Sequence, residues 1–250
     1  MRHKVWGREG NETIARVAYY DGIAQRWDRI TGYHGGAFKR HVLNDRLLGK
    51  IGGIVGKTVL ELGAGNGYFA PLMLRRFSGQ SPARLLITDQ SQKLLAIAQA
   101  QHHADNAEYL ALDVQQPFPL EDTTIELVLA SMLLNELTTS GLQNALHECA
   151  RVLRPGGRLL AAVPHPALVH ALAKKGALTD FGRGLFAMPS AEGLRLPVSR
   201  RSAQAYLDAL EVAGFTAVPE DVFPDEKTLH EKTRLKVPRD TPLALLLDCA

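Results

Sequence analysis

The stretch TVLELGAGNGYFAPLM, residues 58 to 73, constrains the fold of this chain more than any other. An apolar run that ends in an acid is followed by three glycines at alternate positions and then by an amphipathic segment. Val59, Leu60 and Leu62 suit a strand that is buried on both faces, as in parallel sheets covered by helices. Glycines allow a tight turn and a close approach of a ligand to the backbone. The stretch therefore predicts a strand, a glycine loop and a helix within an α/β protein.

The spacing of the glycines indicates the type of ligand. A dinucleotide-binding fingerprint, G-x-G-x-x-G, that started at Gly63 would need its third glycine at position 68, where the chain has Tyr68. The pattern present is E-x-G-x-G-x-G. It resembles the first motif of the class I S-adenosylmethionine (SAM)-dependent methyltransferases of the small-molecule type, in which this loop lies along the methionine part of the cofactor. An NAD(P)-dependent oxidoreductase is the alternative from another class, and the glycine register disfavours it.

Two acids follow later predicted strands at the positions that a nucleotide-like cofactor requires. Residues 83 to 91 form an apolar run that ends in Asp89, and Ser91 is the expected N-cap of the next helix. A carboxylate at this place can accept hydrogen bonds from both ribose hydroxyls, whereas a cap or surface acid is the plainer interpretation. In residues 107 to 120, Asp113 follows a third strand. The resemblance implies that Asp113 accepts from the adenine amine and that the backbone at Val114 contacts the ring.

The resemblance implies a set of residues that bind the cofactor, drawn from the cap, the glycine loop and the ends of the first four strands. These residues are Tyr20, Glu61, Gly63, Ala64, Gly65, Gly67, Asp89, Gln90, Asp113, Val114 and Ser131.

The rest of the chain alternates helical and strand patterns. Residues 124 to 137 predict a fourth strand, and residues 147 to 166 resemble the helix, Arg-Pro-Gly-Gly turn and fifth strand that follow in the family. Ser140, with Gln143 three residues later, predicts a capping box at the start of that helix. Residues 199 to 215 predict a helix, and residues 216 to 222 and 242 to 249 predict two closing strands.

The expected fold is a Rossmann-like, seven-stranded, mostly parallel sheet with helices on both faces and an antiparallel C-terminal hairpin. Residues 1–52 are expected to form an N-terminal tail and a helical cap, and residues 53–250 the SAM-binding domain. The pattern loses its regularity at about 165–201, which predicts a lid or substrate loop inserted in that domain. In the cap, Tyr19, Tyr20 and Tyr33 have three possible roles: their hydroxyls reach the methionine end of the cofactor, they close the substrate pocket, or their rings only pack the cap on the sheet.

The candidate catalytic residues are those expected to lie over the reactive methyl group. SAM already carries an activated methyl group, so the protein's task is mainly to hold donor and acceptor in line. A hydroxyl acceptor benefits from a general base, whereas an amine can react once it is deprotonated. Candidate residues are His165, Glu136 and Asn135, with His34 in the cap as a further possibility. His165 lies between two prolines, and a turn-capping histidine is an equally good interpretation.

Composition argues against several other classes of protein. The net charge of +3, with basic residues scattered along the chain, argues against a nucleic-acid partner. Two cysteines without a Cys-x-x-Cys pair argue against disulfides and a thiolate zinc site, and the nine histidines show no metal-ligand spacing, so no metal is expected. No apolar run suits a membrane helix, and the first residues do not form a secretory signal. A cytoplasmic protein is expected, and its oligomeric state, including a homodimer, stays open.

The sequence therefore predicts a SAM-dependent methyltransferase that releases S-adenosylhomocysteine (SAH). The expected acceptor is an oxygen or nitrogen, less readily a carbon, of a small molecule in secondary or specialised metabolism. The chain lacks the Asn/Asp-Pro-Pro-aromatic sequence common in enzymes that methylate base amines. A methyltransferase acting on tRNA or protein is the alternative within the class. A SAM-binding protein without catalytic activity is a further alternative.

Overall fold

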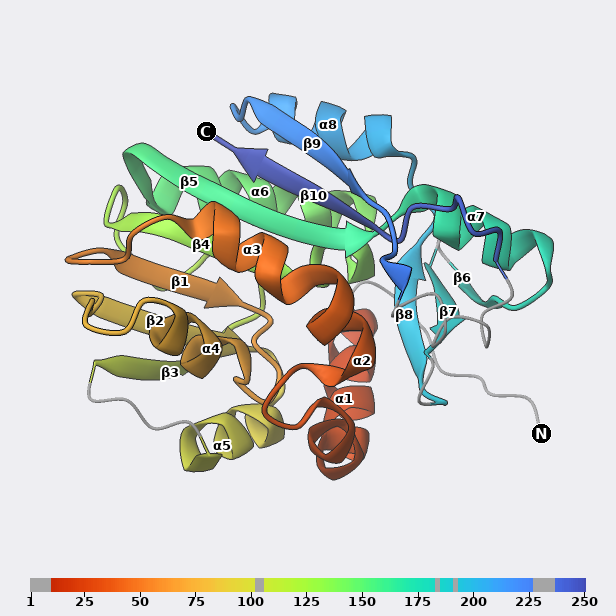
Figure 1. Ribbon diagram of the computed structural model, residues 1–250, viewed down its shortest axis with the longest axis horizontal. Coiled ribbons are helices and arrows are strands. Elements are labelled where there is room, and N and C mark those ends of the chain that lie inside the picture. The colour runs from red at the N-terminus through yellow and green to blue at the C-terminus, as the bar shows by residue number, and fades with distance from the viewer. Residues whose placement is uncertain (1–9, 102–105, 183–184, 191–192, 227–236) are drawn as a thin grey trace.

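A seven-stranded sheet forms the centre of the molecule. The computed structural model describes residues 10–101, 106–182, 185–190, 193–226 and 237–250 (Figure 1). The strand order is β3-β2-β1-β4-β5-β10-β9. The first five strands are parallel, and β10 runs antiparallel to both β5 and β9. This arrangement confirms the predicted Rossmann-like sheet with two closing strands. The strands are β1 (Thr58–Leu62), β2 (Arg84–Asp89), β3 (Ala107–Ala111), β4 (Ile125–Ser131), β5 (Leu153–Pro164), β9 (Ala217–Val222) and β10 (Ala244–Cys249).

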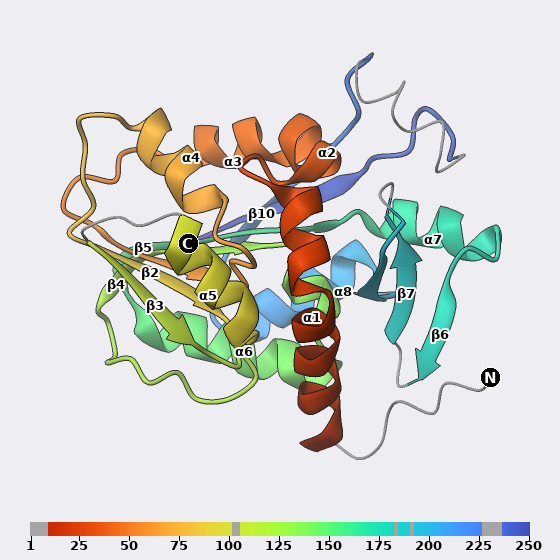
Figure 2. The same cartoon turned by 90° about the horizontal axis from the view of Figure 1, so that it is seen from below.

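Helices cover both faces of the sheet, as Figure 2 shows. Successive side chains of a strand point to opposite faces, so each strand contributes to two apolar cores. Val59 of β1 belongs to the core beneath α3 (Asn44–Ile51) and α4 (Phe69–Arg76). Leu60 and Leu62 belong to the core beneath α6 (Thr139–Val152) and α8 (Ala203–Val212). The apolar run of β1 is therefore explained by burial on both sides.

The starts of two helices test the predicted caps. The side chain of Ser91 accepts a hydrogen bond from the Leu94 N–H at 3.2 Å, which confirms the cap of α5 (Gln92–Gln101). The prediction for α6 is wrong by two residues, because Thr138 is the N-cap and its Oγ1 accepts from the Gly141 N–H at 3.2 Å. Thr138 has an extended backbone (φ −66°, ψ 172°), whereas Ser140 already lies inside the first turn. Only a residue whose backbone leaves the helix can turn its side chain back onto the free N–H groups.

The N-terminal segment folds over the carboxyl ends of the strands. Helix α1 (Gly10–Thr31) is followed by α2 (Gly36–Phe38), a π-helical turn η1 (Lys39–Leu43) and α3. In Figure 1, the arrowhead of β1 points toward the side of the sheet where α1 and α2 lie. Gly35 has φ +85°, and a side chain there would collide with the ring of Tyr68. The cap is therefore packed directly against the residue that follows the glycine loop.

The segment between β5 and α8 holds regular structure where the sequence predicts an irregular loop. It contains α7 (Pro166–Lys174) and a separate antiparallel sheet of β6 (Thr179–Gly182), β7 (Leu185–Pro189) and β8 (Arg195–Ser199). These strands are only four or five residues long, and two contain proline, so their pattern is hard to recognise. In Figure 2, α1 lies between this small sheet and the large one. The short helix η2 (Leu134–Glu136) follows β4.

Candidate functional site

A cavity of about 200 Å³ lies at the carboxyl edge of the large sheet. Its wall is shared by the glycine loop, the ends of β2 and β4, the cap and the small sheet. Nine predicted site residues line it: Tyr20, Gly63, Gly65, Asp89, Gln90, Val114, Ser131, Asn135 and Glu136. Segments far apart in the sequence therefore meet at one place, as the strand order requires.

The glycine loop needs its glycines for two reasons. Gly63, Gly65 and Gly67 have φ values of +65°, +60° and +75°, a conformation that side chains disfavour. A Cβ atom on Gly63 would also lie 3.0 Å from Leu133 Cδ1, and one on Gly65 would lie 3.1 Å from Trp27 Nε1. The loop is thus pressed between the segment after β4 and the cap. Its bare backbone faces the cavity at Gly63 and Gly65.

Asp89 is held at the end of β2 by backbone donors. Its Oδ2 accepts from the Gly65 N–H and its Oδ1 from the Ser91 N–H, both at 2.8 Å. Burial raises the pKa of Asp89, and these hydrogen bonds and Lys39 oppose that rise. Each carboxylate oxygen has two lone pairs, so both can accept one more hydrogen bond from a ligand in the cavity. The carboxylate is therefore both positioned and available.

Several buried polar atoms of the cavity wall have no partner within the part of the chain that the structure describes. They are Trp27 Nε1, Gln90 Nε2, Ser131 Oγ and Asn135 Oδ1. Buried polar groups in proteins are nearly always hydrogen-bonded, because leaving them unpaired costs free energy. Their clustering around one cavity indicates that the cavity binds a polar ligand.

Tyr20 and Glu136 form a buried pair between the cap and the segment after β4. The Tyr20 hydroxyl donates to Glu136 Oε1 at 2.6 Å, and Arg16 Nη1 donates to the Glu136 carbonyl oxygen at 2.8 Å. Burial raises the pKa of Glu136 to about 7, although the Tyr20 hydrogen bond and the charge of Arg16 favour the ionised form. A carboxyl group that titrates near neutral pH can accept a proton during a reaction.

Lys39 brings a cation to the cavity. Its Nζ lies 5.6 Å from the ring centroid of Trp27 and 5.1 Å from that of Tyr68, within the range of cation–π attraction. No carboxylate of the described residues forms an ion pair with it. Burial lowers the pKa of Lys39, and the charges of Glu61, Glu136 and Asp89 partly restore it. An anionic group of a ligand would complete this arrangement.

Five predicted residues lie outside the lining of the cavity. Ala64 and Gly67 belong to the glycine loop, and Glu61 is buried beneath it with only 6% of its surface exposed. Asp113 Oδ1 accepts from the Gln115 N–H at 3.1 Å, while its neighbour Val114 reaches the cavity.

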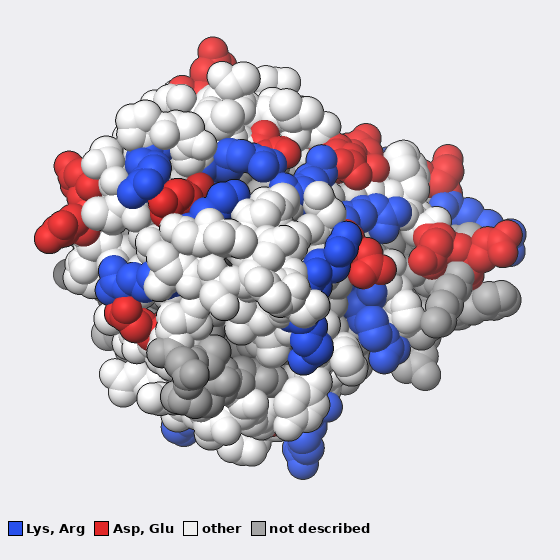
Figure 3. Space-filling view, turned by 60° about the vertical axis from the view of Figure 1, so that its left-hand side comes forward, with Lys and Arg blue, Asp and Glu red and all other residues white. Residues whose placement is uncertain are grey.

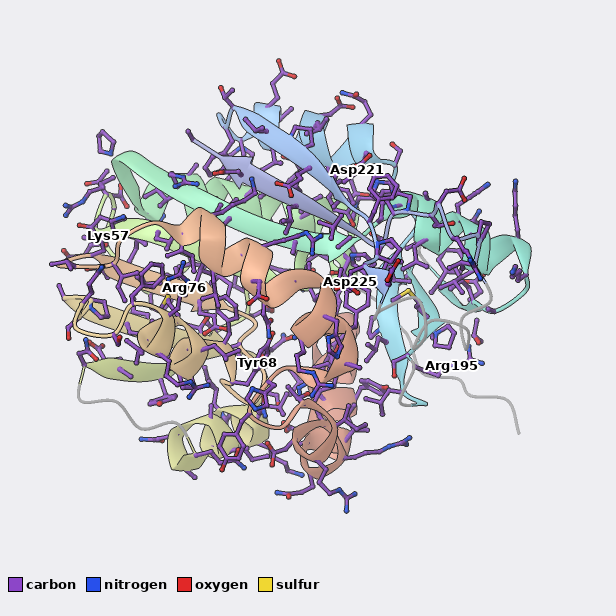
Figure 4. All side chains as sticks on the ribbon, in the orientation of Figure 1. Lys57, Tyr68, Arg76, Arg195, Asp221 and Asp225 are labelled. Carbon is purple, nitrogen blue, oxygen red and sulfur yellow. The ribbon has the colours of Figure 1, made fainter. Side chains whose placement is uncertain are left out.

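His165 is the fifth of these residues, and it caps α7. Its Nδ1 accepts from the Ala167 N–H at 3.0 Å. Its Nε2 therefore carries the hydrogen and donates to Asp221 Oδ1 at 3.1 Å. Asp221 is labelled in Figure 4, beside the start of α7. This is the capping role that the sequence left open, and a catalytic role for His165 stays a prediction.

Sequence patterns did not indicate several residues of the wall. Lys39 lies in the π-helical turn, and Met188, Leu194, Leu196 and Pro197 come from β7, β8 and the segment between them. None of them belongs to a motif, because their position depends on how the cap and the small sheet fold over the large one.

Neither a metal site nor a membrane-spanning helix is found in the described residues. No group of three or more His, Cys, Asp or Glu side chains in the described ranges could hold a metal ion. In the same ranges, no helix has both the length and the apolar character needed to cross a membrane.

The strand order, the glycine loop at the switch between β1 and β4, and the acid after β2 define a class of protein. The fold is that of SAM-dependent methyltransferases, and part of the chain matches a methyltransferase domain family. The methyltransferase domain family matches residues 59–157, which run from β1 to the Arg-Pro-Gly-Gly segment.

Known relatives support this classification. A malonyl-[acyl-carrier protein] O-methyltransferase of Methylococcus capsulatus is 31% identical over 149 residues, which are 56% of this chain and 52% of that protein. The ubiquinone/menaquinone biosynthesis C-methyltransferase UbiE of Rubrivivax gelatinosus is 29% identical over 154 residues, 61% of this chain and 56% of that protein. The chain thus spans little more than half the length of these curated relatives. A SAM-dependent methyltransferase structure from Mesorhizobium loti shares the fold, with a TM-score of 0.63, 20% identity and coverage of 86% of this chain and 98% of that one.

Proposed function

We propose that this chain transfers a methyl group from SAM to an oxygen or nitrogen atom of a small molecule. The observation that carries the proposal is Asp89, fixed by the Gly65 N–H at the cavity where Gln90 Nε2 and Ser131 Oγ have no partner among the described residues. A ligand with vicinal hydroxyls, further polar groups and a carboxylate would satisfy this wall, and the cofactor of the family has these groups.

The residues of this wall fit the cofactor part by part. Asp89 accepts from the ribose hydroxyls, and Gly63 and Gly65 leave room for the methionine chain. Gln90 and Val114, with Asp113 behind them, hold the adenine. Lys39 pairs with the methionine carboxylate, because it faces the cavity without another anionic partner in the described chain. The remaining predicted residues, Glu61, Ala64, Gly67, Tyr20 and Ser131, shape or support this wall.

When bound, SAM supplies an electrophilic methyl group on a sulfonium. The residues of this chain then have three tasks: to hold the acceptor in line with that methyl, to exclude water and to receive a proton where the acceptor loses one. Asn135 and Glu136 lie in the cavity wall just after β4 and can perform these tasks. His165 has a positioning role: it caps the start of α7, next to Pro164 of the cavity wall.

The nature of the acceptor is part of the proposal. The relatives named above are an O-methyltransferase and a C-methyltransferase, so similarity alone leaves the acceptor atom open. We call the part of the cavity next to Glu136 the acceptor space, because the acceptor is proposed to bind there. The carboxyl group of Glu136 beside this space favours an oxygen or nitrogen atom as the methyl acceptor. On the face shown in Figure 3, Lys and Arg side chains alternate with Asp and Glu, and most of the surface is uncharged. The described residues on this face form no continuous basic area for RNA, which favours a small molecule.

The test is a calorimetric titration of the purified chain with SAH, with NADH as a parallel ligand. We expect saturable binding of SAH alone. Asp89→Ala should weaken that binding ten-fold or more, because a hydrogen bond to a charged group contributes about 1.5–3 kcal/mol. Asp208→Ala, on the exposed side of α8, is the matched control and should bind SAH as the wild type does. Binding of NADH in place of SAH, or an unchanged affinity of the Asp89 variant, would contradict the proposal.

A further inference from the structure

The wall of the cavity combines polar and apolar groups. Its polar groups come from the glycine loop, the ends of β2 and β4, η2 and the cap. Much of the remaining wall is apolar, including Phe38, Leu133, Leu168, Met188, Leu196 and Pro197. Among the described residues that line the cavity, Lys39 is the one basic side chain. If Lys39 serves the cofactor, the acceptor space has no cation to neutralise an anionic acceptor.

Glu136 lines the same cavity as these apolar side chains. It ends η2, and the neighbouring Asn135 Nδ2 donates to the Pro197 carbonyl of β8 at 3.3 Å. Its Oε1 and its carbonyl oxygen are occupied by Tyr20 and Arg16. Within the described chain, no hydrogen bond uses its second carboxylate oxygen, Oε2. That oxygen is therefore available to one donor in the acceptor space.

Building on the proposed methyl transfer, we propose that Glu136, positioned by Tyr20, is the general base for an acceptor hydroxyl carried on an uncharged, apolar body. The hydroxyl donates its proton to Glu136 Oε2. The acceptor oxygen forms a bond to the methyl carbon, and the bond between that carbon and sulfur breaks with its electron pair on sulfur. The products are the methyl ether, neutral SAH and a protonated Glu136, which releases its proton to solvent before the next turnover.

The charges of the wall select against other acceptors. A carboxylate or phosphate on the acceptor would be buried beside Glu136 and Asp89, and burial of an unpaired charge is costly. An ammonium group would bring three N–H donors to a largely apolar wall, whereas a hydroxyl brings one. A neutral amine is already nucleophilic, so its methylation would hardly depend on Glu136.

The ionisation of Glu136 depends on groups from each element packed around it. Its pKa is raised to about 7, chiefly by burial and in part by the charge of Asp89 of β2. Tyr20 and Arg16 of α1 and Lys39 of η1 lower it. The carboxylate form that accepts a proton therefore predominates above about pH 7, so turnover should rise with pH through this region. Removal of the Tyr20 hydroxyl should raise this pKa and move the rise to higher pH.

The first experiment measures binding and needs no turnover. The full chain, saturated with SAH, is titrated above neutral pH with three probes of one shape, para-propylphenol, para-propylaniline and para-propylbenzoate. We expect the phenol to bind about ten-fold more tightly than either of the others, because its hydrogen bond to Glu136 is charge-assisted. Glu136→Gln should reduce that preference, whereas Glu211→Gln, exposed on α8, should leave it unchanged. Preference for the benzoate, equal binding of all three or no saturable binding of the phenol would overturn the inference.

The second experiment follows transfer of labelled methyl from SAM to para-propylphenol against pH. Glu136→Gln should lower turnover by about a hundred-fold or more, the usual contribution of a general base. Tyr20→Phe should keep most of the maximal rate but shift the rise of the pH profile upward. An unshifted profile in the Tyr20 variant, or full activity of the Glu136→Gln variant, would overturn the assignment. Loss of SAH binding by the wild type would contradict the proposed function itself, whereas normal SAH binding without the phenol preference would contradict only this inference.

Discussion

At the scale of single residues, we expect Lys39 to bind the amino-acid part of the cofactor and to make no contribution to binding of its nucleoside. Lys39→Met keeps the alkyl stem that lies over Trp27 and Tyr68 and removes the charge. We expect the affinity for SAH to fall by roughly ten-fold, because a charge-assisted hydrogen bond to the carboxylate is lost. Methylthioadenosine has no carboxylate, so its affinity should stay unchanged. Both affinities can be measured by calorimetry.

Lys50→Met is the control for this prediction, because Lys50 pairs with Glu220 at 2.8 Å and does not line the cavity. An equal loss of affinity for both ligands in the Lys39 variant would mean that Lys39 supports the shape of the cavity and does not bind the carboxylate.

Glu61 makes the stability of the fold depend on pH. Burial raises its pKa from 4.5 to about 8 in the folded protein, although the charge of Lys39 opposes this. Between these values the folded chain holds a proton that the unfolded chain has released. The contribution of Glu61 is therefore fully present below about pH 4.5 and is lost as the pH rises to about 8.

Glu61→Gln should remove this dependence, because glutamine does not titrate. Each pKa unit corresponds to about 1.4 kcal/mol, and we expect the wild type to lose at least about 1 kcal/mol more than the variant between pH 5 and 8. Urea unfolding of both proteins across this range measures the difference. Parallel curves would show that Glu61 titrates in the folded protein as it does in the unfolded chain.

Sequence predicts a site residue well where the backbone alone determines its position. Gly63 and Gly65 follow a buried strand, and Asp89 ends the neighbouring strand, so parallel pairing brings them together at one edge. Lys39 and Met188 could not be predicted in this way, because they approach the cavity only through the packing of the cap and the small sheet. For His165 the sequence left the role open, because a histidine between two prolines suits a helix cap as well as a catalytic site.

At the scale of elements, the start of α6 offers a sharp test of helix capping. Thr138→Ala should destabilise the protein by about 1 kcal/mol, because the Gly141 N–H loses its acceptor. Ser140→Ala, two residues further along and exposed, should change the stability little. Chemical denaturation of the two variants decides between the caps. A larger loss for the Ser140 variant would restore the capping box that the sequence suggested.

The elements of the large sheet were predictable and those of the small sheet were not. Strands β1, β2 and β4 are buried on both faces, so their apolar runs stand out between turn residues. Strand β8 contains Pro197, and β7 ends at Pro189, so neither has a clear strand pattern. These short strands pair only with one another, β7 with both β6 and β8. Their structure depends on tertiary packing, which cannot be predicted from the local pattern of apolar and polar residues.

At the scale of the whole molecule, the cavity is closed by segments from distant parts of the chain. The Tyr19 hydroxyl of α1 donates to the Arg195 carbonyl of β8 at 2.5 Å, and Arg26 Nη2 donates to the Gly193 carbonyl at 3.2 Å. In Figure 4, Tyr68 and Arg195 lie on opposite sides of α1. Helix α1 therefore joins the glycine-loop side of the cavity to the small sheet.

Helix α1 and strand β8 together form the cover of the cavity. This arrangement predicts that SAH stabilises both of these segments when it binds. If α1 must lie in place for SAH to bind, an excess of SAH of about 100-fold over its dissociation constant should add about 2.7 kcal/mol to the free energy of opening the cover. Amide hydrogen exchange measured by mass spectrometry should then slow by about 100-fold in α1 and in β8 together. Helix α8 packs against α6 on the far face of the sheet and serves as the internal control.

The Tyr19→Phe variant tests whether the two segments respond as one. Without the hydroxyl that reaches Arg195, SAH should still slow exchange in α1, but the protection of β8 should decrease. An equal slowing in α8 would mean that SAH suppresses only global unfolding. Protection confined to the glycine loop would mean that α1 and the small sheet are not coupled to the cofactor, and that the cover forms independently of the ligand it encloses.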